Sequence, residues 1–191
     1  MLEKIKSVLN PLINTDYDIN VEDVITSLVK LCTDKILDLQ DELTLIEHKD
    51  FGDIEINHED IFYKINIKTQ NVGKTYSFPN LISIKRAKDI LTDHNNHIIY
   101  VFIEYEYINN MTKISKIKVQ RIESLDWSYL YIQNLGKGQL QIKNIPQEEF
   151  LFNNNISREQ WLNTLIEKGK EYYDSLILKV VEYKSDWEKD G

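Results

Sequence analysis

Three polar residues in the first half of the chain have types and a spacing that could hydrolyse a phosphate ester. Asp53 lies in the alternating stretch GDIEIN, and Asn66 and Lys68 stand two residues apart in the next alternating stretch, YKINIKTQN. Because side chains two residues apart point to one face of a strand, paired strands could bring all three together. A carboxylate can hold Mg²⁺, while a nearby lysine can orient water and stabilise developing charge. Taken alone, the pattern is also typical of an ordinary polar strand face.

The strands that must position these residues follow from hydrophobic periodicity. GDIEIN and IFYKINIKTQ both alternate, and NHED between them, Asn57 to Asp60, is typical of a hairpin turn. The run HIIYVFIEYEY, His97 to Tyr107, is so apolar that it predicts a central strand covered on both faces. KISKIKVQRI predicts a further strand with a basic face, and GQLQIKN, from Gly138, predicts another.

Three helices are expected around these strands. The first should begin near Asn20, and the second should span roughly residues 79–92 with Ser77 as a possible cap. The third should open at Ser157, which begins a Ser-x-x-Gln capping box. Its aromatic stripe, from Trp161 to Tyr183, is typical of a core or a dimer surface.

The order helix, strands, helix, strands, helix predicts an α/β fold with a mixed β-sheet flanked by helices. A length of 191 residues fits one domain, with an N-terminal helical part at 1–50, a sheet and active-site region at 51–145, and a C-terminal helix at 157–187. No apolar run is long enough for a membrane span, and a cytoplasmic protein is expected.

Two features invite a chemical interpretation but favour a structural one. The single cysteine, Cys32, lies in the apolar-periodic run SLVKLC, which predicts a buried and unreactive thiol. His94 and His97, in DHNNH, have a spacing that could bind a metal, but no wider ligand pattern accompanies them. A helix-to-strand turn is the better interpretation of that stretch.

The net charge of −8 is unevenly distributed along the chain. Residues 1–60 carry a net charge of −10, residues 61–147 carry +6, and the remainder carries −4. No acidic residue occurs between Tyr63 and Lys88, although that stretch contains six cations. A chance charge block would explain this, but so would an anionic partner that approaches the middle of the chain.

The segment YKINIKTQNVGKTYSFPNLIS resembles the active-site strand, loop and helix start of type II restriction endonucleases of the HincII and HpaI group, which belong to the PD-(D/E)xK nuclease superfamily. LYIQNLGKGQLQIK is similar to a family segment with the same Gln-x-Gln ending, and NNISREQWLNTL is similar to its helix start. The resemblance covers roughly residues 50–180, and the first fifty residues match poorly.

The resemblance implies an endonuclease of a restriction system, a hydrolase that uses Mg²⁺ and accepts Mn²⁺ in its place. Asp53 would be the first metal ligand, Lys68 the catalytic lysine, and the backbone carbonyl of Ile67 a further ligand. Asn66 occupies the place of the second metal-binding aspartate. An amide oxygen can ligate magnesium but brings no charge, so metal affinity should fall.

Three explanations of Asn66 remain open. The chain could be a variant in which an asparagine replaces the aspartate to remove catalysis. Another acid could have taken over, either Glu55, which shares the face of Asp53, or Glu22, from the first helix. The protein could also have evolved into a DNA binder that does not cleave.

The resemblance further implies a homodimer that binds a short palindrome in double-stranded DNA. Glutamine and asparagine can read adenine, and lysine can reach guanine, so two polar segments are candidate DNA-binding elements. Their residues are Gln70, Asn71, Lys74, Tyr76, Ser77 and Asn80 in the first segment, and Gln133, Asn134, Lys137, Gln139 and Gln141 in the second. The alternatives are a DNA-binding protein without catalysis, and a protein-interaction domain whose basic middle pairs with acidic ends.

Overall fold

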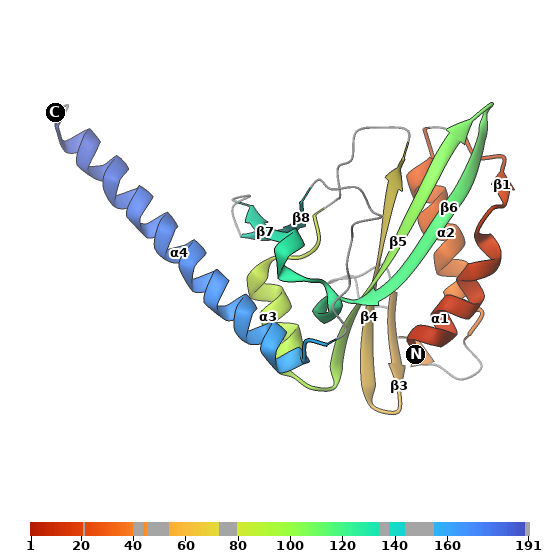
Figure 1. Ribbon diagram of the computed structural model, residues 1–191, viewed down its shortest axis with the longest axis horizontal. Coiled ribbons are helices and arrows are strands. Elements are labelled where there is room, and N and C mark those ends of the chain that lie inside the picture. Colours follow the sequence, from red (N-terminus) through yellow and green to blue (C-terminus); the bar gives the residue numbers. More distant parts are fainter. Residues whose placement is uncertain are drawn as a thin grey trace.

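The computed structural model describes residues 1–20, 22–39, 44–45, 54–72, 80–133, 138–143 and 155–189. Within these ranges, six strands form one sheet in the order β1-β6-β5-β4-β3-β2, with helices on both sides (Figure 1). The strands are β1 (Asp16–Tyr17), β2 (Thr44–Leu45), β3 (Ile54–His58), β4 (Ile61–Asn71), β5 (Asn96–Ile108) and β6 (Met111–Arg121). The predicted fold class, a mixed β-sheet flanked by helices, is confirmed.

The sheet is mixed because β4 and β5 run parallel, whereas the other neighbours are antiparallel. Parallel neighbours need a crossover connection, and helix α3 (Ile84–Thr92) lies in it. β5 is central, as its apolar sequence predicts. From Ile98 to Ile103 every side chain is at most 4% exposed. Such a strand must be covered on both faces.

The hairpin predicted at NHED joins β3 to β4. Its turn is formed by Glu59 and Asp60, which both have positive φ, at 53° and 61°. Two successive residues of this kind define a turn whose twist matches that of the flanking strands. The turn fixes the register, so that His58 pairs with Ile61 and Ile54 pairs with Ile65.

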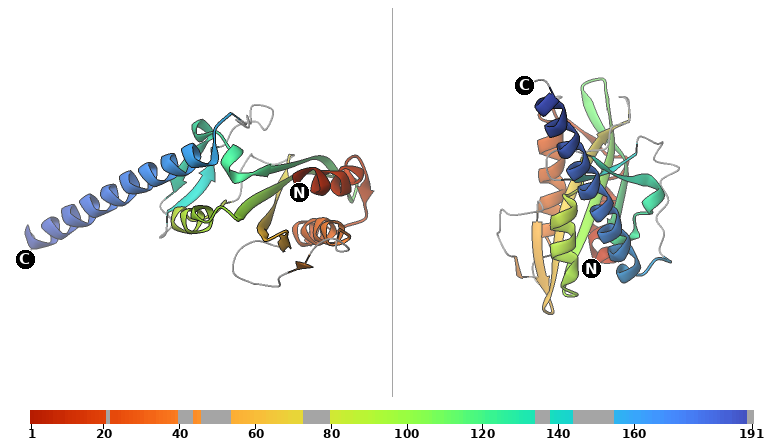
Figure 2. Two further views of the ribbon diagram at one scale, coloured as in Figure 1. Left: turned by 90° about the horizontal axis from the view of Figure 1, so that it is seen from below. Right: turned by 90° about the vertical axis from the view of Figure 1, so that its left-hand side faces the viewer.

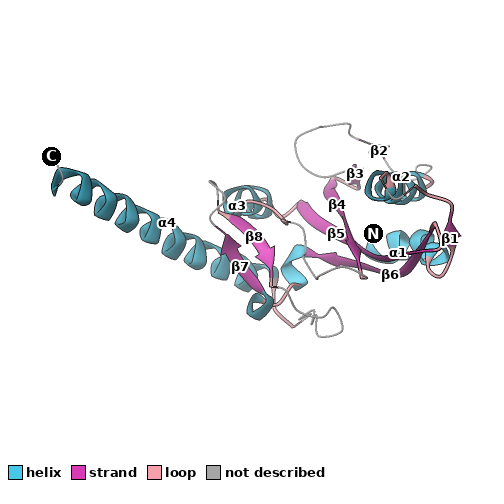
Figure 3. Cartoon of the chain, turned by 90° about the horizontal axis from the view of Figure 1, so that it is seen from above, coloured by secondary structure: helices cyan, strands magenta, loops and turns pink. Residues whose placement is uncertain are grey.

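A first hydrophobic core lies between the sheet and two N-terminal helices, α1 (Leu2–Leu9) and α2 (Val24–Leu37). The odd-numbered side chains of β4 and β5 point into it, and Figure 3 shows both helices on this side of the sheet. Burying an isoleucine or leucine contributes about 2 kcal/mol. Its fully buried members include Ile5, Leu9, Leu28, Cys32, Ile65, Ile99, Val101 and Ile103.

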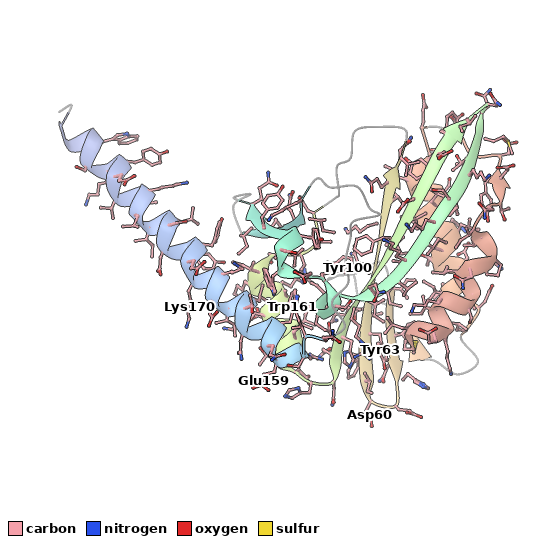
Figure 4. The ribbon with its side chains drawn as sticks, in the orientation of Figure 1. Asp60, Tyr63, Tyr100, Glu159, Trp161 and Lys170 are labelled. Atoms are coloured by element: carbon pink, nitrogen blue, oxygen red, sulfur yellow. The ribbon has the colours of Figure 1, made fainter. Side chains whose placement is uncertain are left out.

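A second core covers the opposite face of β5. It is formed with α3, the base of α4 (Arg158–Lys189) and a separate two-stranded sheet, β7 (Leu130–Gln133) and β8 (Gln139–Ile142). Figure 4 labels Tyr100, on this face of β5, and Trp161, at the base of α4. Trp161 is 0% exposed, and its Nε1 donates a hydrogen bond to the Leu125 carbonyl at 2.9 Å.

The helix boundaries differ from those predicted. The sequence interpretation missed α1, and α2 begins at Val24 rather than near Asn20. The helix predicted at 79–92 begins only at Ile84, where Ser83 accepts a hydrogen bond from the Arg86 amide. The physical reason is that the preceding residues pair with β8, through the Leu81 amide to Leu140 and the Leu140 amide to Ile82. An extended segment cannot also be helical.

The predicted capping box at the start of α4 is confirmed. The Gln160 amide donates to Ser157 Oγ at 3.1 Å, and the Ser157 amide donates to Gln160 Oε1 at 3.0 Å. The next residue, Arg158, donates to the carbonyls of Leu91, Asp93 and His94 at 2.8, 2.7 and 3.3 Å. These hydrogen bonds fasten the base of α4 to the end of α3.

No helix among the described residues is long and apolar enough to cross a membrane.

Cys32 should be chemically inert in the folded protein. Its side chain is 0% exposed, and burial raises the pKa of the thiol to about 12. At about pH 8 the folded protein therefore contains almost none of the thiolate that reacts with alkylating agents. We expect iodoacetamide to label the protein in urea but not in buffer, as followed by mass spectrometry. Equal labelling rates in the two conditions would contradict the buried placement.

Replacing Arg158 with methionine should lower the free energy of unfolding by about 2–3 kcal/mol, because charged hydrogen bonds to the carbonyls that end α3 are lost. Urea denaturation would measure the change. The matched control is Lys179→Met, on the exposed half of α4, which should change stability by less than about 0.5 kcal/mol. Equal effects of the two substitutions would exclude the anchoring role of Arg158.

Candidate metal and nucleic-acid site

One face of the sheet carries polar side chains from four neighbouring strands. The register pairs Glu55 with Lys64, and Asn66 with Tyr100, so their side chains point to the same side. This side is opposite to the first core. We define the polar face by Glu55 of β3, Lys64, Asn66, Lys68 and Gln70 of β4, Tyr100 and Glu104 of β5, and Lys116, Lys118 and Gln120 of β6.

Asn66 is the most informative residue of the polar face. It is 9% exposed, and its side-chain oxygen Oδ1 has no hydrogen-bond partner among the described residues. A buried acceptor without a partner costs about 1–3 kcal/mol. Such a cost is rarely retained in a fold without a reason, and strained or unsatisfied groups concentrate where a ligand binds. The geometry thus supplies a buried oxygen that a cation or a donor could satisfy.

Glu55 and Lys64 form an ion pair beside Asn66. Lys64 Nζ donates to Glu55 Oε1 at 2.6 Å, and the two side chains are only 20% and 10% exposed. Lys64 precedes Asn66 by two residues on β4, so Glu55 is the diagonal neighbour of Asn66 across the strands. The Glu55 carboxylate is already balanced by a cation. That Glu55 compensates for the missing aspartate stays a prediction. A metal ion would have to compete with Lys64 for the Glu55 carboxylate.

The basic residues of the middle segment gather on the polar face. Lys64 and Lys68 lie on β4, and Lys116 and Lys118 lie on β6. Among the described residues, Glu55 and Glu104 are the acids between them, and Glu106 continues this face beyond Glu104, opposite Lys113. Burial and the charge of Lys116 lower the pKa of Lys118, while Glu104 opposes this effect. The two lysines of β6 therefore repel each other, and an anion bound nearby would relieve that repulsion.

The other predicted metal ligands differ in how far the structure supports them. Asp53 lies outside the described residues; in the sequence it directly precedes Ile54, where β3 begins. The Ile67 side chain belongs to the first core and is 5% exposed, so a metal-binding role would fall to its backbone carbonyl. Glu22 precedes α2, which packs on the face opposite to Asn66. The prediction that Glu22 compensates for the missing aspartate is therefore wrong.

The described residues contain no cluster of three or more histidine, cysteine, aspartate or glutamate side chains that could hold a metal. His97 stacks on Tyr63, with ring centroids 5.4 Å apart, and its Nδ1 lies 3.3 Å from a guanidinium nitrogen of Arg158. His94 offers its carbonyl to the same guanidinium. The stretch DHNNH joins α3, which ends at Thr92, to β5, which begins at Asn96, so the predicted helix-to-strand turn is confirmed.

The predicted DNA-binding residues of the second segment lie on the β7–β8 hairpin. The register pairs Gln133 with Gln139 and Tyr131 with Gln141, so these four side chains share the face opposite to Leu130, Leu140 and the second core. Gln133 and Gln139 are partly exposed, whereas Gln141 is 8% exposed. A two-stranded ribbon with such a polar face has dimensions that fit a DNA major groove.

Gln141 has a structural role in this hairpin. Its Oε1 accepts a hydrogen bond from the Tyr131 hydroxyl at 2.8 Å, and its Nε2 donates to Asn80 Oδ1. Gln141 therefore joins the hairpin to the segment that leads into α3. Asn80 is exposed, so it stays a candidate for DNA contact, whereas Gln141 acts by positioning it.

In the first segment, Gln70 lies on the polar face and is 6% exposed. Asn71 points to the opposite face, where its side chain hydrogen-bonds to Tyr105. The remaining predicted DNA-binding residues lie outside the described residues and are Lys74, Tyr76, Ser77, Asn134 and Lys137.

Gly138, which directly precedes β8, lets the backbone approach two helices closely. The structure shows that Gly138 has φ +61°, and that a Cβ there would lie 2.8 Å from Tyr172 Cε1 and 3.0 Å from Ile84 Cδ1. The close approach is thus to α4 and α3, and it seats β8 against both helices.

Glu104, Lys116, Lys118 and Gln120 were not named as site residues from the sequence. The basic alternation of KISKIKVQ was the available signal. Which face of the sheet it joins depends on the pairing of Phe102 with Lys118. A register shift between Glu104 and Tyr105 interrupts that ladder, so alternation alone could not have given the pairing.

No protein-family model matches the sequence, and no curated protein matches it. Among solved structures, the chain is similar to the NlaIV restriction endonuclease, with a TM-score of 0.52 and 12% sequence identity over 90% of this chain and 89% of that one. An identity this low carries the fold alone. The chain therefore has a restriction-endonuclease-like fold, and a closer relation to the HincII and HpaI group stays a prediction.

Proposed function

We propose that this chain is a DNA-binding protein of the type II restriction endonuclease kind, whose polar face is the phosphodiesterase site and takes Mg²⁺ or Mn²⁺. One observation carries the proposal. The buried Oδ1 of Asn66 has no partner among the described residues, and it stands on the face where the sheet gathers its lysines. The restriction-endonuclease-like fold supports the same conclusion.

The residues of this face fit a divalent cation in part. Hard cations prefer oxygen ligands, and Asn66 Oδ1 is such an oxygen; Asp53 and the Ile67 carbonyl would complete the set. A bound divalent cation would supply charge neutralisation at the phosphate and a more acidic water. The chain's own contributions are the Lys68 ammonium, which would hold charge beside the phosphate, and Asn66, which would orient a ligand oxygen.

The neutral side chain of Asn66 limits this site. In the place of an aspartate it removes one negative charge, and the Glu55 carboxylate beside it is matched by Lys64 at 2.6 Å. Fewer negative ligands hold a divalent cation less tightly. The same observation favours a second function, a DNA-binding protein on this fold that cleaves slowly or not at all. Both functions include DNA binding, and they differ only in whether the bound DNA is cleaved.

Substituting Asn66 with aspartate should raise DNA cleavage by at least about 100-fold, because one added carboxylate strengthens both metal binding and transition-state charge balance. Plasmid digestion in Mg²⁺ and in Mn²⁺ measures this, with the unaltered protein beside it. The control is Asn66→Asp combined with Lys68→Met, which should lose the gain. If the aspartate form binds DNA and still does not cut, the non-cleaving function replaces the catalytic one.

Duplex binding should depend on the lysines of the polar face. We expect the affinity to fall steeply with salt, and Lys116→Ala to reduce the slope of the log–log plot by about 1, the value for one lost phosphate contact. Fluorescence anisotropy with labelled duplex measures both. Lys30→Ala is the control, because Lys30 lies on α2, across the sheet. If no salt-sensitive binding occurs, both DNA functions fail, and the protein-interaction domain is favoured.

A further inference from the structure

Helix α4 extends far beyond the body of the protein. Its first turns pack on α3 and the second core, and the remainder projects away, as Figure 1 and the left view of Figure 2 show. At 32 residues it is about 48 Å long. The large hydrophobic side chains exposed on this helix are Tyr173 (41%), Ile177 (60%), Leu178 (63%), Val180 (65%), Val181 (59%), Tyr183 (67%) and Trp187 (83%).

This surface is too apolar to be left in water. Seven of the ten large hydrophobic side chains exposed among the described residues lie on the projecting half of α4. Four of them, Tyr173, Val180, Tyr183 and Trp187, lie along one side of the helix and together present an area on the order of 500 Å², as large as the largest apolar patch of a typical monomer. A standard stable interface takes roughly 800 Å² from each partner, so such a contact also covers the side chains beside this line.

The spacing of the side chains identifies the kind of surface that would cover them. Residues at alternating steps of three and four form a continuous line, which we call the α4 seam. The α4 seam consists of Gly169, Tyr173, Leu176, Val180, Tyr183 and Trp187. This spacing is the heptad rule of helices that pack side by side over several turns. A seam of this kind requires a second helix with the same repeat, and every copy of the chain carries one.

The two ends of the α4 seam are complementary to each other. At the inner end, Gly169 lines a groove of about 420 Å³ between α3 and α4, together with Ile84, Leu165 and Tyr173. At the outer end stands Trp187, the largest side chain and the most exposed of the seam. Gly169 itself is buried on the floor of this groove, so a parallel pair would leave the groove empty while two Trp187 side chains would crowd together.

We propose that two copies of this chain associate through antiparallel pairing of their α4 seams, with each Trp187 inserted into the partner's groove between α3 and α4. Antiparallel pairing about the middle of the seam sets Trp187 opposite Gly169, Tyr183 opposite Tyr173, and Val180 opposite Leu176. The interface is isologous and therefore closes as a dimer. The two bodies then lie at opposite ends of the helix pair, where neither obstructs the other.

A matched pair of substitutions tests the α4 seam. Val180 and Leu178 are 65% and 63% exposed, but they lie about 200° apart around the helix, and only Val180 belongs to the seam. We expect the unaltered protein and Leu178→Glu to be dimers by sedimentation equilibrium, and Val180→Glu to dissociate at least 100-fold more readily. A monomeric unaltered protein, or equal effects of the two substitutions, would overturn the proposal. Circular dichroism and the inertness of Cys32 verify that each variant is folded.

Cysteine cross-linking tests the antiparallel arrangement and the insertion of Trp187. Cys32 does not interfere because it is buried. Gly169 is buried on the floor of the groove, and a Cβ there meets Ile84 Cδ1 at 3.5 Å, an ordinary contact, so a cysteine at this position tests whether residue 187 of the partner enters the groove. A mixture of Gly169→Cys chains and Trp187→Cys chains should form the mixed disulfide. Cross-links only between identical chains would indicate a parallel pair and overturn the arrangement.

The same experiments would also reveal a different partner for this surface, such as a lipid membrane. Binding of a monomer to phosphatidylcholine vesicles, followed by a change in tryptophan fluorescence that Trp187→Phe removes, would assign the surface to lipid and overturn the proposal. None of these measurements includes DNA or a metal. Failure of the dimer is therefore distinguishable from failure of the proposed nuclease function.

Discussion

The parallel pairing of β4 and β5 is the constraint on which the rest of the structure depends. It aligns Asn66 with Tyr100 and Lys68 with Phe102, and it thereby sets which side chains share a face. A shift of one residue would exchange the faces, sending Ile65 and Ile67 to the polar side and the lysines into the first core. The burial of Ile65 at 0% and Ile67 at 5% opposes that shift strongly. The hydrophobic core and the candidate site are thus two sides of one register.

The two faces of the sheet have different roles. The face toward α1 and α2 is apolar along β4 and β5, and it stabilises the domain. The other face is apolar on β5 from Ile98 to Phe102, where α3, α4 and the β7–β8 hairpin cover it, and polar at Glu104 and on β3, β4 and β6. Polar groups can be retained there because β5 is fixed from both sides. A rigid scaffold beside a polar surface is the arrangement that positioned chemistry requires.

The strands and the capping box could be predicted from the sequence, because their signals are local. Alternation identified β3 and β4, a continuous apolar run identified β5, and Ser157 with Gln160 identified the start of α4. The start of α3 could not be predicted, since Ile82 and its neighbours are held in extended conformation by β8, a contact across the fold. Only part of the candidate site could be predicted, for the same reason. Asn66 and Lys68 follow from one strand, whereas Lys116 and Lys118 join them only through a pairing that a register shift interrupts.

The turn at Glu59 and Asp60 has a consequence for the order in which the chain folds. It closes β3 onto β4 with a loop of two residues, so this hairpin costs little entropy and can form early. The pairing of β4 with β5 must instead wait for α3 and its flanking segments to cross over, and non-local pairing of this kind is slow. We therefore expect Asn66 to receive its neighbours from β5 later than those from β3. The surface that would bind DNA is incomplete in a chain that has formed only this hairpin.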